Sequence, residues 1–460
     1  MEIIKDKKIL KIIEKIKNAI KLTRFEGHVY VVGGAIRNSL LKQPIHDLDI
    51  VVDIEGGGIM VANLLAGKEK SFLMHSNPVI FPTYGTAKVV LYKDEELKDI
   101  NIEFVDSRKQ KYTPLGSKCF GTIEEDSKRR DLTINSLYWN ICDTKIYDFN
   151  NGVDDLTTKT LRTSRPDEMF AENPIKMLRV IRFSSELGWG IARDTWLSII
   201  NNSQLIKTAP QELISSELTK ILISPNASMG IRKMAYCGLL HRIMPDIYDL
   251  KTAYESYEPK VTAFDHTMKV LDAVQPLIEN RLAALFHDVG SVVTEGYNRT
   301  MSRDMFSASV AVSDLKEMKF STSVLNAVET AIRYHRIFAN YADGVTPPDK
   351  KIRKFVNVCG EHIGTAVDLM NANNLNTTFN KKKMQALDVL NRIEKLDAIE
   401  EAKNIKLPIN GSDVMKEFNI KGPAVGKVLN AVKDALLENP KLTKAEAFKV
   451  AEKTIKVLAT

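Results

Sequence analysis

The chain has 460 residues, enough for about three domains at ~150 residues each. Its 65 Lys and Arg against 58 Asp and Glu give a net charge of +7, and 44% of its residues are hydrophobic. This composition excludes a mostly disordered or fibrous chain, and it permits a polyanionic partner. We expect no membrane association, because no apolar run approaches the ~18 residues of a spanning helix. Four cysteines without zinc or redox spacing and the absence of a signal peptide predict a cytoplasmic protein with reduced thiols.

Short β-branched runs predict strands in the first part of the chain. Five are expected, at residues 28–32, 48–53, 86–92, 101–106 and 136–140. Gly33 and Gly34 end the first strand and open a helix over residues 35–41. Turn-forming residues at 112–126 predict a loop.

Further along the chain, hydrophobic residues recur with the period of an α-helix. It predicts helices at residues 173–204, 213–223, 229–240, 265–274, 278–286, 324–334 and 382–396. Proline-rich breaks at 345–349 and 407–411 precede a lysine-rich helical tail. The predicted domains are residues 1–165, 166–250, 251–400 and 401–460.

Paired carboxylates in the second predicted strand indicate a metal site. Residues i and i+2 of a strand share a face, so Asp47 and Asp49 should lie side by side, and Glu103 could add a third acid. Hard oxygen ligands suit Mg²⁺, and the Gly33–Gly34 turn lets the backbone approach a phosphate. A site that holds two metal ions beside a phosphate-binding turn is typical of enzymes that catalyse in-line nucleotidyl transfer. The alternative is an Asp-x-Asp that only caps a turn beside a glycine bend.

Several segments then resemble one family. GGAIRNSLL followed by HDLDIV resembles the signature of class II tRNA nucleotidyltransferases and bacterial poly(A) polymerases, a branch of the polymerase-beta-like nucleotidyltransferases. In order along the chain, EEDSKRRDLTINSLYWN, GVDDLTTKTLR, ENPIKMLRVIRFSSELG and PINGSDVMKEFNIKGPAVGKVL are similar to later motifs of that family. The resemblance implies an α+β fold with a mixed five-stranded head followed by all-α neck, body and tail domains.

The resemblance also implies roles for individual residues. Asp47, Asp49 and Glu103 would be catalytic, with Asp47 and Asp49 holding two Mg²⁺ ions. Asp131 would accept a hydrogen bond from the ribose of the incoming nucleotide, with arginine near its phosphates. The full set implied to bind the nucleotide is Gly33, Gly34, Arg37, Arg130, Asp131, Asn135, Glu172, Asn173, Lys176, Arg179 and Arg182.

One helix motif departs from the family. Where the family has Asp and Arg three residues apart, which can imitate a Watson–Crick partner for C or A, this chain has Asn173 and Lys176. The amide of Asn173 can present either its oxygen or its nitrogen, and the ammonium of Lys176 lacks the two parallel donors of a guanidinium. We therefore expect looser or weaker selection of the base.

Histidines in the second half resemble the HD phosphohydrolase domain that is appended to some of these enzymes. His266, His287 and Asp288 could hold a transition metal, with His335 as a further candidate. The late acid of that domain could be Asp368, but the local match equally places Asn371 there. We expect a helical scaffold with an incomplete ligand shell and without turnover.

The function implied by the resemblance is template-independent addition of the 3′-terminal CCA to tRNA from CTP and ATP. The alternative within the same enzyme class is a poly(A) polymerase. The implied partners are nucleoside triphosphates and the acceptor stem and elbow of tRNA, and the oligomeric state is left open. An RNA-binding module without chemistry and an HD-type phosphodiesterase are weaker hypotheses, because the acids and glycines of the head are intact.

Overall fold

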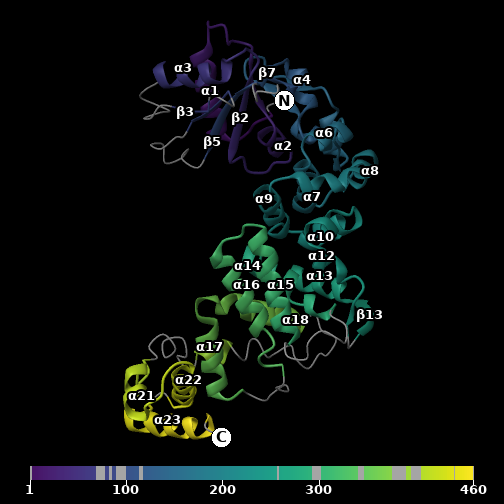
Figure 1. Cartoon of the computed structure of the whole chain (residues 1–460). Helices are drawn as coiled ribbons and strands as arrows, with labels where there is room; N and C mark the ends of the chain where they lie inside the picture. Colours follow the sequence, from purple (N-terminus) through teal and green to yellow (C-terminus); the bar gives the residue numbers. More distant parts are fainter. Residues whose placement is uncertain are drawn as a thin grey trace. The chain divides into compact units, whose positions relative to one another are not determined.

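The computed structural model describes residues 3–68, 78–81, 85–89, 100–112, 118–255, 258–292, 302–339, 347–375, 390–394, 406–439 and 441–458. The chain divides into two compact units (Figure 1). The first comprises residues 1–210 with 236–239, and the second comprises 211–235 with 240–460. The division into four domains stays a prediction. Among the described residues, no helix combines the length and the apolarity that a membrane span requires.

A mixed sheet of seven strands forms the head of the first unit, so the predicted α+β class is confirmed. In sheet order the strands are β3 (Val79–Phe81), β4 (Thr86–Val89), β5 (Asn101–Asp106), β2 (Asp47–Val52), β1 (Val29–Val32), β8 (Leu137–Asn140) and β9 (Ile146–Asp148). The predicted number, five, was too low. The two missed strands have three residues each and no buried side chain, so they lack the alternation that marks a strand.

The centre of this sheet is built from continuous apolar runs. All four residues of β1 are buried, and β1 pairs antiparallel with both β2 and β8. Strand β2 pairs in parallel with β5. In β2 the first and third residues are exposed while the others are buried, so Asp47 and Asp49 share the outward face as predicted.

The predicted loop at 112–126 is wrong for its described second half. A second, two-stranded sheet pairs β6 (Arg108–Tyr112) with β7 (Lys118–Phe120), and helix α4 (Ile123–Lys128) follows. A capping box starts α4, since Thr122 accepts from the Glu125 amide and Glu125 accepts from the Thr122 amide. Residues 113–117 lie outside the described residues.

Eight helices are described in the first unit. They are α1 (Lys7–Ile20), α2 (Gly34–Leu40), α3 (Gly57–Lys68), α4, α5 (Gly152–Thr157), α6 (Pro166–Glu172), α7 (Ile175–Leu187) and α8 (Arg193–Asn202). The helix predicted over 173–204 is wrong as one element, because Gly188 takes a φ of 71° and ends α7. The short strand β11 (Gly190–Ile191) then pairs with β10 (Thr160–Leu161) before α8 begins.

The described part of the second unit is almost entirely helical, as predicted (Figure 1). Its longer helices are α9 (Gln211–Leu222), α10 (Ala227–Tyr236), α13 (Ala263–Ala273), α14 (Ile278–Phe286), α15 (Arg303–Glu317), α16 (Thr322–Tyr334), α17 (Asp349–Cys359), α18 (Ile363–Leu375), α21 (Gly411–Phe418), α22 (Pro423–Glu438) and α23 (Lys444–Leu458). The lysine-rich tail is helical as predicted, and α21 to α23 share an apolar core. The helix predicted at 382–396 lies mostly outside the described residues, of which 390–394 are helical.

Candidate active site

Three acids converge on the exposed face of β2 and β5. The parallel register places Asp49 opposite Glu103, and Asn101 donates a hydrogen bond of 3.0 Å to Asp47. The pKa of Asp49 is raised because the surrounding protein limits its hydration; Glu103 and Asp47 raise it further, while Arg130 opposes them. Clustered carboxylates with a raised pKa favour a bound cation, and their oxygens suit Mg²⁺. The group is open, because within the described residues no three of its oxygens lie within 4.8 Å of one another.

The glycine turn lies directly beside Asp49. Val32, the last residue of β1, pairs with Asp49, and Gly33 follows with a φ of 69° before α2 begins. A Cβ at Gly33 would lie 3.6 Å from both the Asp49 carboxylate and the Arg130 guanidinium. Glycine adopts this φ without strain, so the turn brings the first residues of α2 next to the acids, and the first backbone N–H groups of a helix have no acceptor within the helix. The structure thus brings Gly33, Asp49 and Arg130 together, with Gly34 as the next residue along the chain.

Arg130 is held by a buried carboxylate that the sequence reasoning missed. Asp126 is fully buried, and it accepts hydrogen bonds from Tyr138, from Arg129 at 2.6 Å and from Arg130 at 3.1 Å. Burial favours the neutral acid, but the two arginines outweigh it and lower the pKa of Asp126. Arg129 and Arg130 follow Asp126 by three and four residues, at the end of α4, and this spacing is a signal that could have revealed the network.

A second buried network surrounds Asp131. Its Oδ1 accepts from Asn135 at 3.0 Å and from the Leu132 amide at 2.9 Å, and its Oδ2 accepts twice from Arg179, at 2.7 and 2.8 Å. Arg37 extends this hydrogen-bond network by donating to the side-chain oxygen of Asn135 at 2.6 Å. Burial would raise the pKa of Asp131, but Arg179 and Asn135 lower it to about 2. Since a carboxylate accepts about four hydrogen bonds, a ribose hydroxyl would have to replace one of these donors.

The residues at the start of α7 are arranged differently from the prediction. Asn173 is not part of α7; it follows the last residue of α6, Glu172, and both are exposed. Lys176 donates to the backbone carbonyl of Arg129 at 2.8 Å, and burial lowers its pKa although Asp131 opposes this. Asn173 and Lys176 are therefore not two equivalent positions on one helix face. Lys176 connects α7 to the Arg129–Arg130 segment.

Arg182 also lies on α7 and is mostly buried. It pairs with Glu186 at 2.9 Å, and its guanidinium lies 4.2 Å from the centre of the Phe183 ring. Arg37 lies over the same ring at 5.0 Å. Phe183 and Glu186 thus fix two of the predicted nucleotide-binding arginines, and neither was recognised from the sequence.

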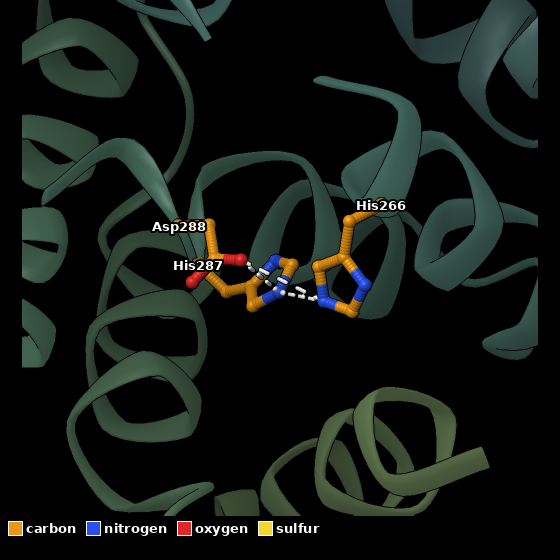
Figure 2. A group of neighbouring side chains, drawn as sticks. All are labelled: His266, His287 and Asp288. Carbon is orange, nitrogen blue, oxygen red and sulfur yellow. Dashed lines mark hydrogen bonds and ion pairs between the residues drawn. The ribbon is translucent and has the colours of Figure 1, made fainter. Parts of the chain in front are cut away.

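A separate cluster forms in the second unit (Figure 2). His266 lies on α13, and His287 and Asp288 follow α14; their ligand atoms lie within 4.8 Å of one another. The amide oxygen of Asn373, on α18, lies 2.9 Å from Nε2 of His266. Asp368 and Asn371 do not occupy this position: Asp368 accepts from Gln275 and Asn280, and Asn371 lines a different pocket. His335 packs its ring against His287 with centroids 5.6 Å apart.

Two family models match parts of the chain. A family model described as the poly(A) polymerase head domain matches residues 29–162. A second, described as the probable RNA and SrmB-binding site of polymerase A, matches residues 188–250.

Relatives match over nearly the whole chain. A CC-adding tRNA nucleotidyltransferase of Thermus thermophilus is 26% identical over 91% of this chain and 92% of its own length. A CCA-adding enzyme of Ligilactobacillus salivarius is 28% identical over 95% of this chain and 96% of its own.

Solved structures share the fold. The CCA-adding enzyme of Bacillus stearothermophilus in complex with CTP has a TM-score of 0.66 at 21% identity and covers 99% of both chains. The Thermotoga maritima CCA-adding enzyme complexed with tRNA has a TM-score of 0.59 at 18% identity, over 98% of this chain and 96% of its own.

Proposed function

The chain belongs to the family of tRNA nucleotidyltransferases and bacterial poly(A) polymerases, and we propose that it adds the 3′-terminal CCA to tRNA from CTP and ATP. The arrangement that carries this proposal is the convergence of Asp47, Asp49 and Glu103 with the Gly33 turn. Such a site can hold a triphosphate beside acids, which is what nucleotidyl transfer to an RNA hydroxyl requires.

Asp47 and Asp49, assisted by Glu103, would hold two Mg²⁺ ions. The residues fit these ions, because their side chains are exposed and lie on the same face of two adjacent parallel strands. When bound, Mg²⁺ supplies positive charge that stabilises the transferred phosphoryl group and the pyrophosphate leaving group. The protein itself would contribute the backbone N–H groups at the start of α2 and the charge of Arg130, which lies beside the Gly33 turn.

Residues of the head together with residues of α7 would hold the ribose and the base. Asp131 is the proposed acceptor for a ribose hydroxyl, and Arg37, Asn135 and Arg179 orient its carboxylate. The exposed Asn173 and Glu172 and the half-buried Lys176 stand at the start of α7, where the family motif meets the base. Arg182, further along α7, is the last of the proposed nucleotide-binding residues.

The proposed macromolecular partner is tRNA, bound by the helical domains at its acceptor stem and elbow. A-form RNA is recognised there mainly through phosphates and shape, and the lysine-rich segment 401–460 can supply such phosphate contacts. We propose a cytoplasmic location, consistent with Cys142 and Cys359 forming no disulfide.

Addition of CC alone is a second candidate function. It is favoured by one observation, the match over 91% of the chain to a relative named as CC-adding. Poly(A) addition is the less favoured alternative, since the curated relatives matched along most of the chain are named as CC- or CCA-adding.

The function is tested by incubating the purified chain and Mg²⁺ with tRNA that ends at the discriminator base. We expect CTP alone to extend the tRNA by two nucleotides and CTP with ATP to extend it by three. Extension by ATP alone into a long tail would favour poly(A) synthesis. No extension with any nucleotide would contradict the assignment as a nucleotidyltransferase.

A further inference from the structure

A row of cross-strand neighbours runs through the candidate active site and continues beyond the acids. Asp49 lies opposite Glu103, and Glu103 lies opposite Lys88 of β4. Directly opposed residues of neighbouring strands project from the same face of a sheet. Lys88 is half-buried and Glu103 is exposed. The face that carries the acids therefore also carries a lysine, which has no role in the proposed binding of the nucleotide.

Along this row the acids have a cation on each side. On one side, Arg130 lies beside Gly33 and donates to the hydroxyl of Tyr138, which stands two strands from Asp49. On the other side, Lys88 also stands two strands from Asp49, about 10 Å away at about 4.8 Å per strand. Within the described residues, Lys88 forms no ion pair and no side-chain hydrogen bond, so its ammonium is available to an anion from outside the chain.

Given the proposed function, on which this inference rests, the direction of the reaction distinguishes the two sides. In nucleotidyl transfer the attacking and the leaving oxygens lie roughly in line, on opposite sides of the transferred phosphorus. The start of α2 and Arg130 are the proposed binding groups for the triphosphate, so pyrophosphate leaves on their side. The 3′-hydroxyl of the RNA must then approach from the side of Glu103 and Lys88.

We propose that Lys88 binds the phosphodiester that links the last two nucleotides of the RNA and so positions the 3′-hydroxyl for attack. This phosphate is the negative charge of the RNA that lies nearest to the attacking hydroxyl. A lysine ammonium is a compact charge on a flexible stem with three donors, and a backbone phosphate is a feature of every 3′ end, whatever its last base. Lys88 also offsets the charge of Glu103, which would otherwise repel the incoming backbone.

A double-mutant cycle between protein and RNA tests this contact. The tRNA that ends at the discriminator base is prepared with either a normal or an uncharged methylphosphonate linkage before its last nucleotide. Both RNAs are extended by the full chain and by Lys88→Met, and kcat/KM for RNA is measured at saturating CTP. We expect either change alone to lower kcat/KM about tenfold, and the two together to lower it little further. The KM for CTP should change less than twofold.

Matched variants and a binding measurement complete the test. Lys88→Arg keeps the charge and should recover most of the activity. Lys145→Met, which removes an exposed lysine between β8 and β9, should behave as the unsubstituted chain. The dissociation constants of both RNAs, measured by filter retention without Mg²⁺ or nucleotide, give a readout that needs no turnover. In Lys88→Met the log–log salt dependence of binding should become shallower by about 0.7–1.

The contact is disproved if the two changes act independently and together lower kcat/KM about 100-fold, or if Lys88→Met instead raises the KM for CTP tenfold. A chain that extends the normal tRNA but shows independent effects would keep the proposed function and lose only the role of Lys88. If no RNA is extended, the proposed function fails, and the same cycle of dissociation constants decides whether Lys88 contacts this phosphate.

Discussion

At the scale of single residues, Asp49 is the group that connects the acids, the glycine turn and Arg130. We expect Asp49→Asn to reduce nucleotide addition at least about 1,000-fold, because several kcal/mol of charge stabilisation are lost in the transition state. Binding of tRNA, measured by filter retention, should stay unchanged. Asp53→Asn is the control: Asp53 follows the same strand but accepts from Ser107. Asp49→Asn with more than a tenth of the original rate would disprove the metal assignment.

The lowered pKa of Asp131 predicts how the stability of the protein changes at acid pH. Its pKa of about 2 lies below its ordinary value of 3.8, so its ionised form stabilises the fold by about 2–3 kcal/mol above pH 4. That contribution is lost as the pH falls from about 4 to about 2. All three tryptophans, Trp139, Trp189 and Trp196, lie in the first unit, so tryptophan fluorescence reports its unfolding.

The matching variant is Asp131→Asn, which cannot ionise. Its free energy of unfolding in urea should fall less between pH 5 and pH 2 than that of the unsubstituted chain, by about 2–3 kcal/mol. Equal pH dependence in the two proteins would show that the Arg179 pair does not stabilise the ionised carboxylate.

The presence of Asn173 and Lys176 in place of the family's Asp and Arg predicts a change in base selection. An amide and an ammonium define hydrogen-bond direction less sharply than a carboxylate and a guanidinium. We expect detectable incorporation of UTP or GTP, and about tenfold better selection of CTP and ATP in the double variant Asn173→Asp with Lys176→Arg. Steady-state kcat/KM for each nucleotide gives the ratio. If the unsubstituted enzyme already rejects UTP as firmly as the double variant, these residues do not select the base.

At the scale of elements, Asp126 joins α4 to β8 through Tyr138 and orients Arg130 toward the site. Removing its charge leaves two arginines without their buried partner. We expect Asp126→Asn to raise the KM for nucleotide about tenfold or more, beyond any loss of stability, because Arg130 is then no longer held toward the phosphates.

A matched variant separates orientation from stability. Asp155→Asn breaks another buried acid–arginine pair in the same unit, with Arg162 at 3.1 Å. It should lower the melting temperature without changing the nucleotide KM. Equal changes of KM in both variants would mean that Asp126 acts only through stability.

Elements also show how far local patterns can predict this fold. The apolar runs in the sequence predicted the central strands. The core of the candidate site was predicted from the alternation of Asp47 and Asp49 and from the Gly33–Gly34 pair. Strands β3 and β9 were missed because neither has a buried side chain. The Asp131–Arg179 pair and the Asn373–His266 contact were missed for another reason: they join residues 48 and 107 positions apart, and no local pattern records such contacts.

At the scale of the whole molecule, the candidate active site and the histidine cluster lie in different units. Because the side chains of His266, His287 and Asp288 are buried, we expect no hydrolysis of 2′,3′-cyclic nucleotides with Ni²⁺, Co²⁺ or Mn²⁺. His287→Ala should leave nucleotide addition intact and reduce only thermal stability. Metal-stimulated hydrolysis that disappears in His287→Ala would instead make the protein bifunctional.

The central claim is that this chain completes the 3′ end of tRNA. The most direct measurement is sequencing of the 3′ ends after tRNA lacking CCA is incubated with the enzyme, Mg²⁺ and all four nucleoside triphosphates. We predict that most products end in CCA, with a minority carrying U or G at one of the three positions. Products that end uniformly in CC would identify the CC-adding activity, and long adenosine tails or unextended tRNA would contradict the claim.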